Sequence, residues 1–473
     1  MTLTSLYFAG FVLLALVIYY LIPRRAQNAF LLLASYAFCA ALGLEFLGVL
    51  LAVTLAGFLF ARGVVPGRRA RKLWLWAGVA VQLGALAFFK YSDYFLPRAM
   101  KLLRLLHMPT PDAGLALLLP VGLSFYTLQA IAYLVDIYQG KSPPAASPLD
   151  FALYMAYFPR LMAGPIERAS KFMGQLSSPR TVDNTVIARG VGLIAVGLVR
   201  KLLVADMLRA LMTGRIFRTP MDFSGPQLIA GLISFAVYVY NDFAGYTSLV
   251  RGVSALFGIE LSPNFNLPFF SRSFTELWTR WHISLSTWLR DYIYYPLSRS
   301  LLRRDPSGRR LLTVVVPPLV TLAASGLWHG ASLNLLAWGA LNGAFMAGER
   351  LMSLARPSSP ADRRPAWRQW VGRVLVISLV LMALVPFQAT LGDSLSYWRG
   401  MLLWTSAALP DVRLLVPFAL GIVIDWAQFL GRDELVFLRW PLWLQGLLLA
   451  LALLAIFLIT RAGVQGPFVY QEF

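Results

Sequence analysis

Long apolar runs recur along the whole chain and constrain its fold more than any other feature. They lie near residues 5–22, 28–42, 44–61, 73–89, 115–138, 186–205, 228–250, 311–329, 331–348, 371–390, 412–429 and 441–460. A helix needs roughly 20 predominantly apolar residues to cross a bilayer, and helices satisfy their own backbone polar groups in lipid. We therefore predict an all-α, polytopic transmembrane bundle with roughly 10–13 spans, some of the short ones re-entrant or interfacial.

The charge distribution agrees with a membrane chain. Of the 473 residues, 58% are hydrophobic and 14% are charged, whereas soluble domains carry about 25% charged residues. The net charge of +20 does not indicate a nucleic-acid partner, because the basic residues gather in short connections, as the positive-inside rule describes. These connections are 24–25, 68–72, 303–304, 309–310 and 363–364. No stretch resembles a soluble domain, so we predict one membrane-embedded domain over residues 1–473.

Two histidines that each follow a tryptophan directly are the candidate reaction centre. His282 stands in the sequence RWHIS and His329 in GLWHG. A group that titrates near neutral pH is costly in lipid and marks a functional site by default. For His282 the alternative is an interfacial side chain bonded to water, and for His329 a structural histidine with satisfied hydrogen bonds. The third histidine, His107, lies near a proline-containing loop and is expected to have no special role.

Small residues surround His329. Glycines at 326 and 330, and again at 339 and 343, have the four-residue spacing that lets helices approach closely. We therefore expect the His329 imidazole to be held between helices rather than to face lipid. Trp328 and Asn334 are candidate supporting residues because they lie close to His329 in sequence.

The segment from Phe274 to Tyr295 is rich in tryptophan and tyrosine at helical spacing. This pattern predicts one amphipathic helix at the membrane interface or beneath the bundle. Steps of four residues from His282 reach Ser286 and Arg290, which we expect on the same face. Arg290 and Asp291 are therefore candidate supporting residues.

Two further stretches do not resemble simple spans. Residues 157–168 contain two prolines and a glycine, which break a helix. Irregular backbone at membrane depth is tolerated only where it is buried in protein or lines a cavity, and the alternative is a surface loop. Asp242 lies inside an apolar run and needs a partner. It is a candidate supporting residue, with a structural ion pair or cap as the alternative.

The motifs present limit the possible chemistry. The sequence contains no P-loop, no dinucleotide-binding glycine fingerprint, no cluster of metal ligands and no serine-hydrolase elbow. No cofactor-binding residue and no metal ligand is assigned. A neutral imidazole can take a proton from a hydroxyl group that attacks an activated acyl group, and such base catalysis contributes typically 10²–10⁴-fold. A proton-coupled transporter would use the same residue types, so both classes remain open at this point.

Five stretches of the chain resemble the membrane-bound O-acyltransferases, in the bacterial branch that contains alginate O-acetyltransferases and teichoic-acid D-alanyl-transfer proteins. They are FPRLMAGPIER at 158–168, NDFAGY at 241–246, NFNLPF at 264–269, WTRWHISLSTWLRDY at 278–292 and GLWHG at 326–330. The ending PFVYQEF at 467–473 also resembles the alginate-type branch. After Leu297, where alginate-type relatives commonly have paired glycines, this chain continues with Ser298-Arg299-Ser300.

The resemblance implies a fold, an activity and partners. His329 matches the family's catalytic histidine in a tunnel through the membrane domain, and His282 matches its second histidine. The implied donor is a cytoplasmic thioester, with acetyl-CoA expected and no cofactor bound. The implied acceptor is a hydroxyl of an exported polysaccharide or peptidoglycan, reached with an SGNH-esterase-like periplasmic partner from the bacterial inner membrane. D-Alanyl transfer from a carrier protein and a non-catalytic acyl transporter or scaffold are the alternatives.

Overall fold

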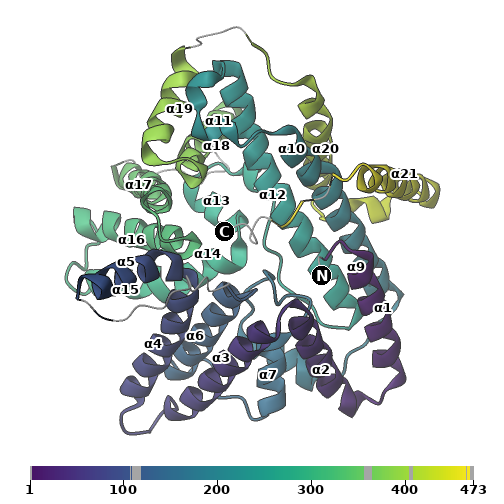
Figure 1. Ribbon diagram of the computed structural model, residues 1–473, viewed down its shortest axis with the longest axis vertical. Helices are drawn as coiled ribbons and strands as arrows, with labels where there is room; N and C mark the ends of the chain where they lie inside the picture. Colours follow the sequence, from purple (N-terminus) through teal and green to yellow (C-terminus); the bar gives the residue numbers. More distant parts are fainter. Residues whose placement is uncertain are drawn as a thin grey trace. The chain divides into compact units, whose positions relative to one another are not determined.

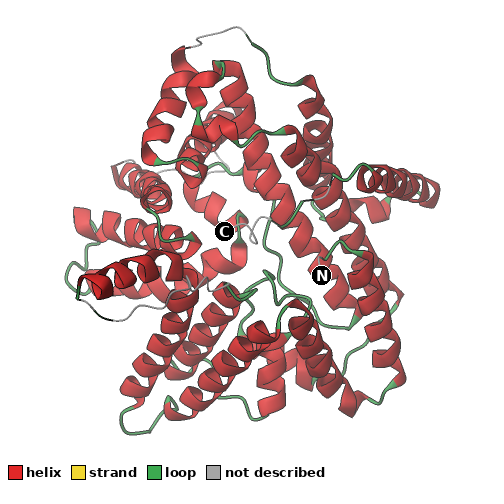
Figure 2. Ribbon diagram, in the orientation of Figure 1, coloured by secondary structure: helices red, strands yellow, loops and turns green. Residues whose placement is uncertain are grey.

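The computed structural model describes residues 3–106, 108, 119–355, 365–403, 408–464 and 466–468. Within these ranges every regular element is a helix (Figure 2), in agreement with the predicted all-α class. The chain divides into two compact units, residues 1–190 with 253–262 and residues 191–252 with 263–473. The single domain expected over residues 1–473 stays a prediction. His107 and residues 469–473 lie outside the described residues.

The first unit contains the amino-terminal helices (Figure 1). They are α1 (Leu6–Leu21), α2 (Arg24–Leu42), α3 (Leu44–Gly63), α4 (Arg71–Lys90), α5 (Ser92–Leu105), α6 (Leu123–Tyr138), α7 (Pro148–Ala156) and α8 (Ala169–Ser177). α9 (Asn184–Leu198) begins in this unit and ends in the second.

The second unit contains the helices that carry both candidate histidines. They are α10 (Asp206–Leu211), α11 (Arg215–Arg218), α12 (Gly225–Leu256), α13 (Phe274–Arg280), α14 (Ile283–Leu289), α15 (Tyr295–Leu302), α16 (Leu311–His329), α17 (Leu333–Ala355), α18 (Ala366–Gln388), α19 (Leu391–Leu403), α20 (Leu415–Gly431) and α21 (Leu442–Arg461). π-Helical turns occupy Val199–Ala205 and Arg290–Tyr294, and 3-10 turns occupy Pro220–Asp222, Pro268–Phe270, Val412–Leu414 and Val436–Arg439.

Seven helices in the described part of the chain are long and apolar enough to cross a membrane, which makes the chain a multi-pass membrane protein. They lie at Leu44–Gly63, Arg71–Lys90, Gly225–Leu256, Leu311–His329, Trp367–Gln388, Val412–Gly431 and Leu442–Arg461. All seven correspond to apolar runs of the sequence. Of the other predicted runs, 28–42 and 331–348 lie in helices of similar length, α2 with 19 residues and α17 with 23, whereas α1 and α6 have 16 residues each.

The irregular segment 157–168 lies in the interior of the first unit. Residues 157–167 are all buried, so the surface-loop alternative is wrong. The Tyr157 hydroxyl lies 3.1 Å from the Ser254 Oγ, and the Phe158 N–H donates to the Ser35 Oγ at 3.0 Å. The second bond satisfies a backbone N–H outside a helix, as irregular backbone buried in protein requires.

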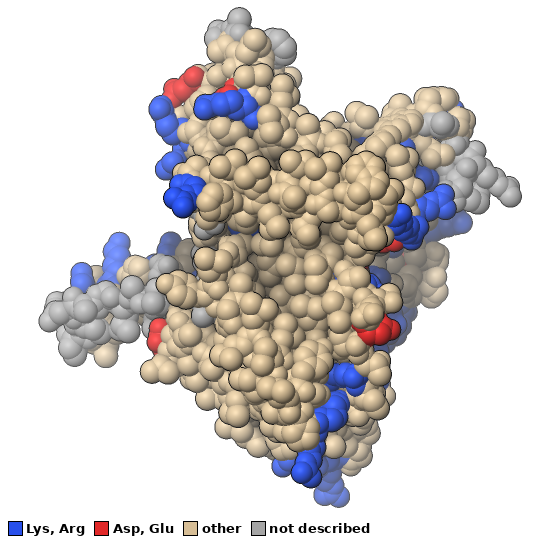
Figure 3. Space-filling model, turned by 90° about the vertical axis from the view of Figure 1, so that its right-hand side faces the viewer, with Lys and Arg blue, Asp and Glu red and all other residues tan. Residues whose placement is uncertain are grey.

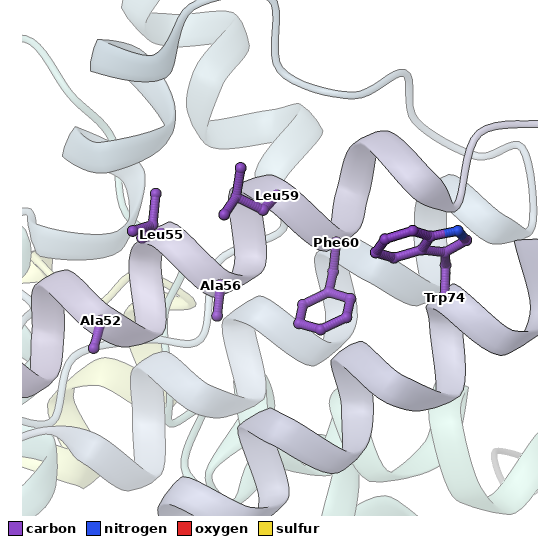
Figure 4. Close-up of a pocket in the computed structure, with 6 residues that line it drawn as sticks. All are labelled: Ala52, Leu55, Ala56, Leu59, Phe60 and Trp74. Atoms are coloured by element: carbon purple, nitrogen blue, oxygen red, sulfur yellow. The ribbon is translucent and has the colours of Figure 1, made fainter.

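Apolar side chains cover the outer surface of both units. Over wide areas of the face drawn in Figure 3, neither basic nor acidic side chains reach the surface. In the first unit an apolar groove of about 590 Å³ runs along α3 and reaches Trp74 of α4, and the side chains of Leu55, Leu59 and Trp74 are exposed there (Figure 4). No residue of α21 is buried. Such surfaces are stable in contact with lipid rather than water.

Glycines, which have no side chain, allow α16 and α17 to come into close contact in the second unit. A Cβ at Gly339 would lie 2.2 Å from the Leu322 carbonyl oxygen, and a Cβ at Gly326 would lie 2.2 Å from that of Leu335. Only glycine allows this approach, as the spacing of the glycines predicts. The contact extends along much of both helices and fixes the end of α16, where His329 lies.

Candidate active site

His329 is the last residue of α16 and is buried among aromatic rings. Its ring centroid lies 4.9 Å from that of Trp328, 5.3 Å from that of Trp338 and 5.1 Å from that of Phe387. Trp338 belongs to α17 and Phe387 to α18, so the imidazole lies between helices as expected. The rings exclude bulk water and fix the orientation of the imidazole.

Asn334 supports this cluster indirectly. Its side-chain amide donates a hydrogen bond to the Pro386 carbonyl at 3.1 Å, which ties α17 to α18 next to Phe387. The bond therefore holds a helix that contacts His329.

His282 lies at a break between α13 and α14. Its φ of 42° and ψ of 54° are left-handed, a conformation that is uncommon for residues other than glycine and costs of order 1–3 kcal/mol. Asn264 stabilises the break, because its carbonyl accepts the Ile283 N–H at 2.8 Å and its Oδ1 accepts the Ser284 N–H at 3.1 Å. Residues other than glycine that adopt left-handed backbone angles are found most often at functional sites.

The prediction of one continuous helix from Phe274 to Tyr295 is therefore wrong. The apolar periodicity continues across the break, but Asn264 supplies bonds that replace those of the helix. His282 is 2% exposed, whereas Arg290 lies on the surface in a π-helical turn. The two side chains do not share one face, because the break and the π-turn both change the helical register.

Burial determines the protonation state of His282. Desolvation lowers the pKa of its imidazole to about 3, so the ring is neutral at physiological pH. A neutral imidazole has one nitrogen that accepts a proton and one that donates. This is the state that a general base or a hydrogen-bonding partner requires.

Trp328 joins the two histidines. Its ring centroid lies 6.2 Å from that of His282 and 4.9 Å from that of His329. The two histidines are 47 positions apart in the sequence (329 − 282), yet both lie in a single aromatic cluster. On its other side, His282 meets Phe243 of α12, with 4.7 Å between ring centroids.

Asp242 lies beside this cluster in an ion-paired network. Lys201 Nζ lies 2.6 Å from an Asp242 carboxylate oxygen and 2.7 Å from one of Asp206, and all three side chains are buried. The π-helical turn and the mutual approach of Gly197 and Gly245 bring Lys201 to α12. Asp242 therefore forms a buried ion pair, which was the structural alternative that its sequence context left open.

The described part of the chain after α21 packs against the same region. Lys201 Nζ also donates to the carbonyls of Gly466 and Pro467, each at 3.3 Å. The ring of Phe468 stacks on that of Tyr246 with 4.2 Å between centroids. Lys201 therefore fixes both α12 and this segment.

A buried arginine-carboxylate pair adjoins this network, because Arg200 precedes Lys201 in the π-helical turn. Arg200 donates to the Asn241 Oδ1 at 2.7 Å and to Asp425 of α20 at 2.5 Å. The Tyr240 hydroxyl donates to the same Asp425 oxygen at 3.2 Å. Buried charges within spans are paired in this way because an unpaired charge is costly there.

A pocket of about 490 Å³ opens beside the histidine cluster. Residues of α13 to α17 line it, and the adjoining π-turn contributes Arg290. Trp278 forms part of its wall and packs against Trp338 with 6.1 Å between ring centroids. Because Trp338 in turn contacts His329, a chain of ring contacts connects the wall of the pocket to that imidazole.

Arg290 lines this pocket, and Asp291 is its neighbour in the π-helical turn. Arg290 Nε lies 3.1 Å from the Asp291 carboxylate, and both groups are solvent-accessible. Arg350 of α17 also lines the pocket, a residue that sequence reasoning missed together with Lys201 and Asn264. The described residues bring together no group of three or more side chains placed to hold a metal ion.

Comparisons with known proteins identify a family and several similar chains. The family model described as MBOAT, membrane-bound O-acyltransferase family, matches residues 144–385. The chain is 35% identical to the probable alginate O-acetylase AlgI of Azotobacter vinelandii, over 80% of this chain and 73% of the relative. It is 29% identical to a peptidoglycan O-acetyltransferase of Helicobacter pylori (84% and 79%) and 26% identical to a teichoic acid D-alanyltransferase of Streptococcus thermophilus (60% and 72%).

Proposed function

Since the chain belongs to the membrane-bound O-acyltransferase family, we propose that it transfers an acetyl group from a cytoplasmic thioester toward hydroxyls of an exported cell-envelope polysaccharide. At the coarser level it is a multi-pass membrane O-acyltransferase of the alginate O-acetylase type. The proposed donor is acetyl-CoA. The proposed location is the bacterial inner membrane, where an SGNH-esterase-like periplasmic partner passes the group on.

The observation that carries this proposal is the contact of both histidines with one tryptophan ring. In the proposed reaction the His329 imidazole takes the proton of the acceptor hydroxyl while that oxygen attacks the thioester carbonyl carbon. The new C–O bond forms as the C–S bond breaks, and the proton then passes to the leaving thiolate. The acceptor is an intermediate partner hydroxyl or the final polymer, and peptidoglycan is a second acceptor of the same chemistry.

His282 takes a different role in this scheme. Its neutral, buried ring and fixed backbone suit it to orient a substrate group or Trp328 rather than to accept the proton first. Asp242, Asn334 and Trp328 act as positioning residues. Trp328 contacts both histidines directly, Asn334 holds α18 next to Phe387, and Asp242 precedes Phe243, whose ring packs on His282.

D-Alanyl transfer from a carrier protein is the second candidate, and the similarity to teichoic acid D-alanyltransferases supports it. The similarity to alginate O-acetylases is higher and covers more of the chain. A non-catalytic acyl transporter has no support among these relatives. Membranes incubated with labelled acetyl-CoA or with labelled aminoacyl carrier protein distinguish the two donors.

The decisive experiment compares His329→Ala and His329→Gln with wild type in membranes at equal protein level. Both variants should lose transfer by about 10²–10⁴-fold, the usual contribution of a positioned base. His107→Ala is the matched control and should retain full activity. Wild-type transfer by His329→Ala would contradict the proposed role.

A further inference from the structure

The apolar groove of the first unit shares no residue with the candidate active site. It is lined by Ala52, Leu55, Ala56, Leu59, Phe60 and Trp74. Because α3 and α4 are both long and apolar enough to cross a membrane, the groove opens toward the acyl chains of the bilayer. Its volume of about 590 Å³ lies in the usual range for small-molecule sites, roughly 300–1,000 Å³.

The dimensions of the groove suit one acyl chain. The small side chains of Ala52 and Ala56 leave space along α3, and Figure 4 shows the Trp74 indole at the end of the groove. From Ala52 to Phe60, eight residues (60 − 52), the helix advances about 12 Å. About ten methylene groups cover this distance at about 1.2 Å per bond. The groove therefore fits within one leaflet, which is half of a hydrocarbon core of about 30 Å.

Trp74 indicates which end of the groove lies at headgroup level. The residue is 44% exposed, and its ring contacts that of Phe60 with 5.8 Å between centroids. A Cβ at Gly63 would lie 2.4 Å from this indole, so the absence of a side chain there lets the ring lie across the end of α3. Tryptophan is enriched where the hydrocarbon core meets the headgroups. The groove therefore extends from headgroup level into the hydrocarbon core.

The connection between α3 and α4, next to Trp74, is strongly basic. Residues 62–72 include Arg62, Arg68, Arg69, Arg71 and Lys72, and they include no aspartate or glutamate. The side chains at 68, 69 and 72 are exposed and form no ion pair within the described part of the chain. By the positive-inside rule this connection faces the cytoplasm, where the membrane leaflet is rich in anionic lipid.

The backbone of this connection is held in place beside the groove. Arg71 donates a hydrogen bond to the Tyr138 carbonyl of α6, and its guanidinium lies 4.4 Å from the centre of the Tyr138 ring. Ala70 has a left-handed φ of 62°, which is uncommon outside glycine. Its carbonyl accepts the Trp74 N–H at 3.1 Å. The exposed cations therefore stand at a fixed place near Trp74.

We propose that the groove and this connection together bind one anionic phospholipid of the cytoplasmic leaflet. One acyl chain lies along α3, and the phosphate contacts Arg68, Arg69 and Lys72. Basic clusters next to a membrane span attract anionic headgroups. A membrane helix of a partner would follow α3 through both leaflets, about 30 Å, and would leave these cations without a counter-charge. The inference goes beyond acyl transfer and does not depend on it.

Native mass spectrometry of the full chain in detergent measures bound lipid directly. One molecule of phosphatidylglycerol should remain bound, whereas phosphatidylcholine, whose headgroup has no net charge, should bind at least about 10-fold more weakly. sn-Glycerol 3-phosphate presents the anion without acyl chains and should not bind at the same concentration. Equal retention of the two lipids, or saturation by glycerol phosphate, would overturn the inference.

A double variant tests the headgroup contact. Arg68→Gln with Arg69→Gln should weaken phosphatidylglycerol binding about 25-fold, at about fivefold for each charge removed, and should leave phosphatidylcholine binding unchanged. Arg303→Gln with Arg304→Gln is the matched control, because these adjacent arginines are also exposed and do not line the groove. It should retain the wild-type lipid preference. An unchanged preference in the first double variant would refute the headgroup contact.

A substitution inside the groove tests the acyl-chain contact. Ala52→Phe fills the groove from an exposed position and should weaken phosphatidylglycerol binding about fourfold for each methylene group displaced. Leu51→Phe is the control, because Leu51 is also exposed and does not line the groove. Wild-type affinity in Ala52→Phe would refute the acyl-chain contact.

Thermal denaturation and oligomeric state complete the test. Phosphatidylglycerol should raise the thermal midpoint of the wild type and of Leu51→Phe, and it should raise that of Ala52→Phe much less, since a ligand stabilises the state that binds it. The midpoints without lipid show that each variant folds. A change of oligomeric state in Ala52→Phe, measured by light scattering, would assign the groove to a second copy of the chain and overturn the inference.

Discussion

Replacement of Gly339 by alanine tests whether the close contact of α16 and α17 positions His329. A Cβ at this position would lie 2.2 Å from the Leu322 carbonyl oxygen, 2.9 Å from the Leu322 carbonyl carbon and 3.0 Å from the Ala323 Cα. All three are backbone atoms of α16, so no side-chain rotation relieves the overlap. The helices must separate locally, seven residues before His329 (329 − 322).

The overlap determines the size of the effect. Ordinary Cβ contacts lie at 3.4–4 Å, so the helices must separate by about 1.2 Å (3.4 − 2.2). Overpacking of this kind costs typically 1–3 kcal/mol. A displacement of about 1 Å at a reacting group lowers the rate about 10²-fold. We expect Gly339→Ala to lower acyl transfer about 10²-fold and to lower the thermal midpoint in detergent.

The assay measures transfer of labelled acetyl groups in membranes, normalised to protein level by immunoblot. Gly348→Ala is the control in the same helix, because a Cβ at Gly348 meets no atom within 4 Å. It should retain activity and gain up to about 1 kcal/mol from helix propensity. Wild-type activity of Gly339→Ala at normal abundance would refute the reasoning, since the close contact would then not position His329.

Three further predictions concern the network and the break. Lys201→Met leaves the Asp242 carboxylate buried with no lysine, so it should cost about 3–5 kcal/mol; thermal denaturation should show partial rescue in the double variant with Asp242→Leu, and an unchanged midpoint in Lys201→Met would contradict the ion-pair account. The pKa of His282 is about 3 in the folded protein and 6.5 in the unfolded chain. At a pH between these two pKa values, the imidazole therefore binds a proton in the unfolded state that it does not bind in the folded state. Stability should therefore fall as pH drops below 6.5, and His282→Gln should reduce that slope in midpoints measured from pH 7.5 to 5. Asn264→Ala removes the acceptor of the Ser284 N–H and should lower the free energy of unfolding by about 1–3 kcal/mol. Acyl transfer should fall together with stability, and intact transfer would show that the break at His282 needs no such bond.

Much of the fold is predictable because its determinants are local. Apolar runs predict spans, since a bilayer imposes one length and one chemistry on each. The glycines at 326 and 339 predict close helix packing, since the absence of a side chain is a property of the sequence itself. The setting of His329 follows from these two rules, and both act within a short stretch of chain.

The setting of His282 could not be predicted in the same way. Apolar periodicity continues through α13 and α14, so the sequence there resembles one helix. The break depends on hydrogen bonds from Asn264, which lies outside the segment. Lys201 was missed for a similar reason, because the run at 186–205 resembles a plain span and its partner Asp242 lies on another helix. Tertiary contacts of this kind leave no periodic signal.

The left-handed backbone at His282 means that selection for stability and selection for activity favour different residues there. Glycine adopts this conformation without the steric penalty that a Cβ brings, roughly 1–2 kcal/mol. Glycine would also remove the need to desolvate an imidazole. A library randomised at position 282 and sorted for thermal resistance should therefore enrich glycine, and the same library sorted for acyl transfer should return histidine.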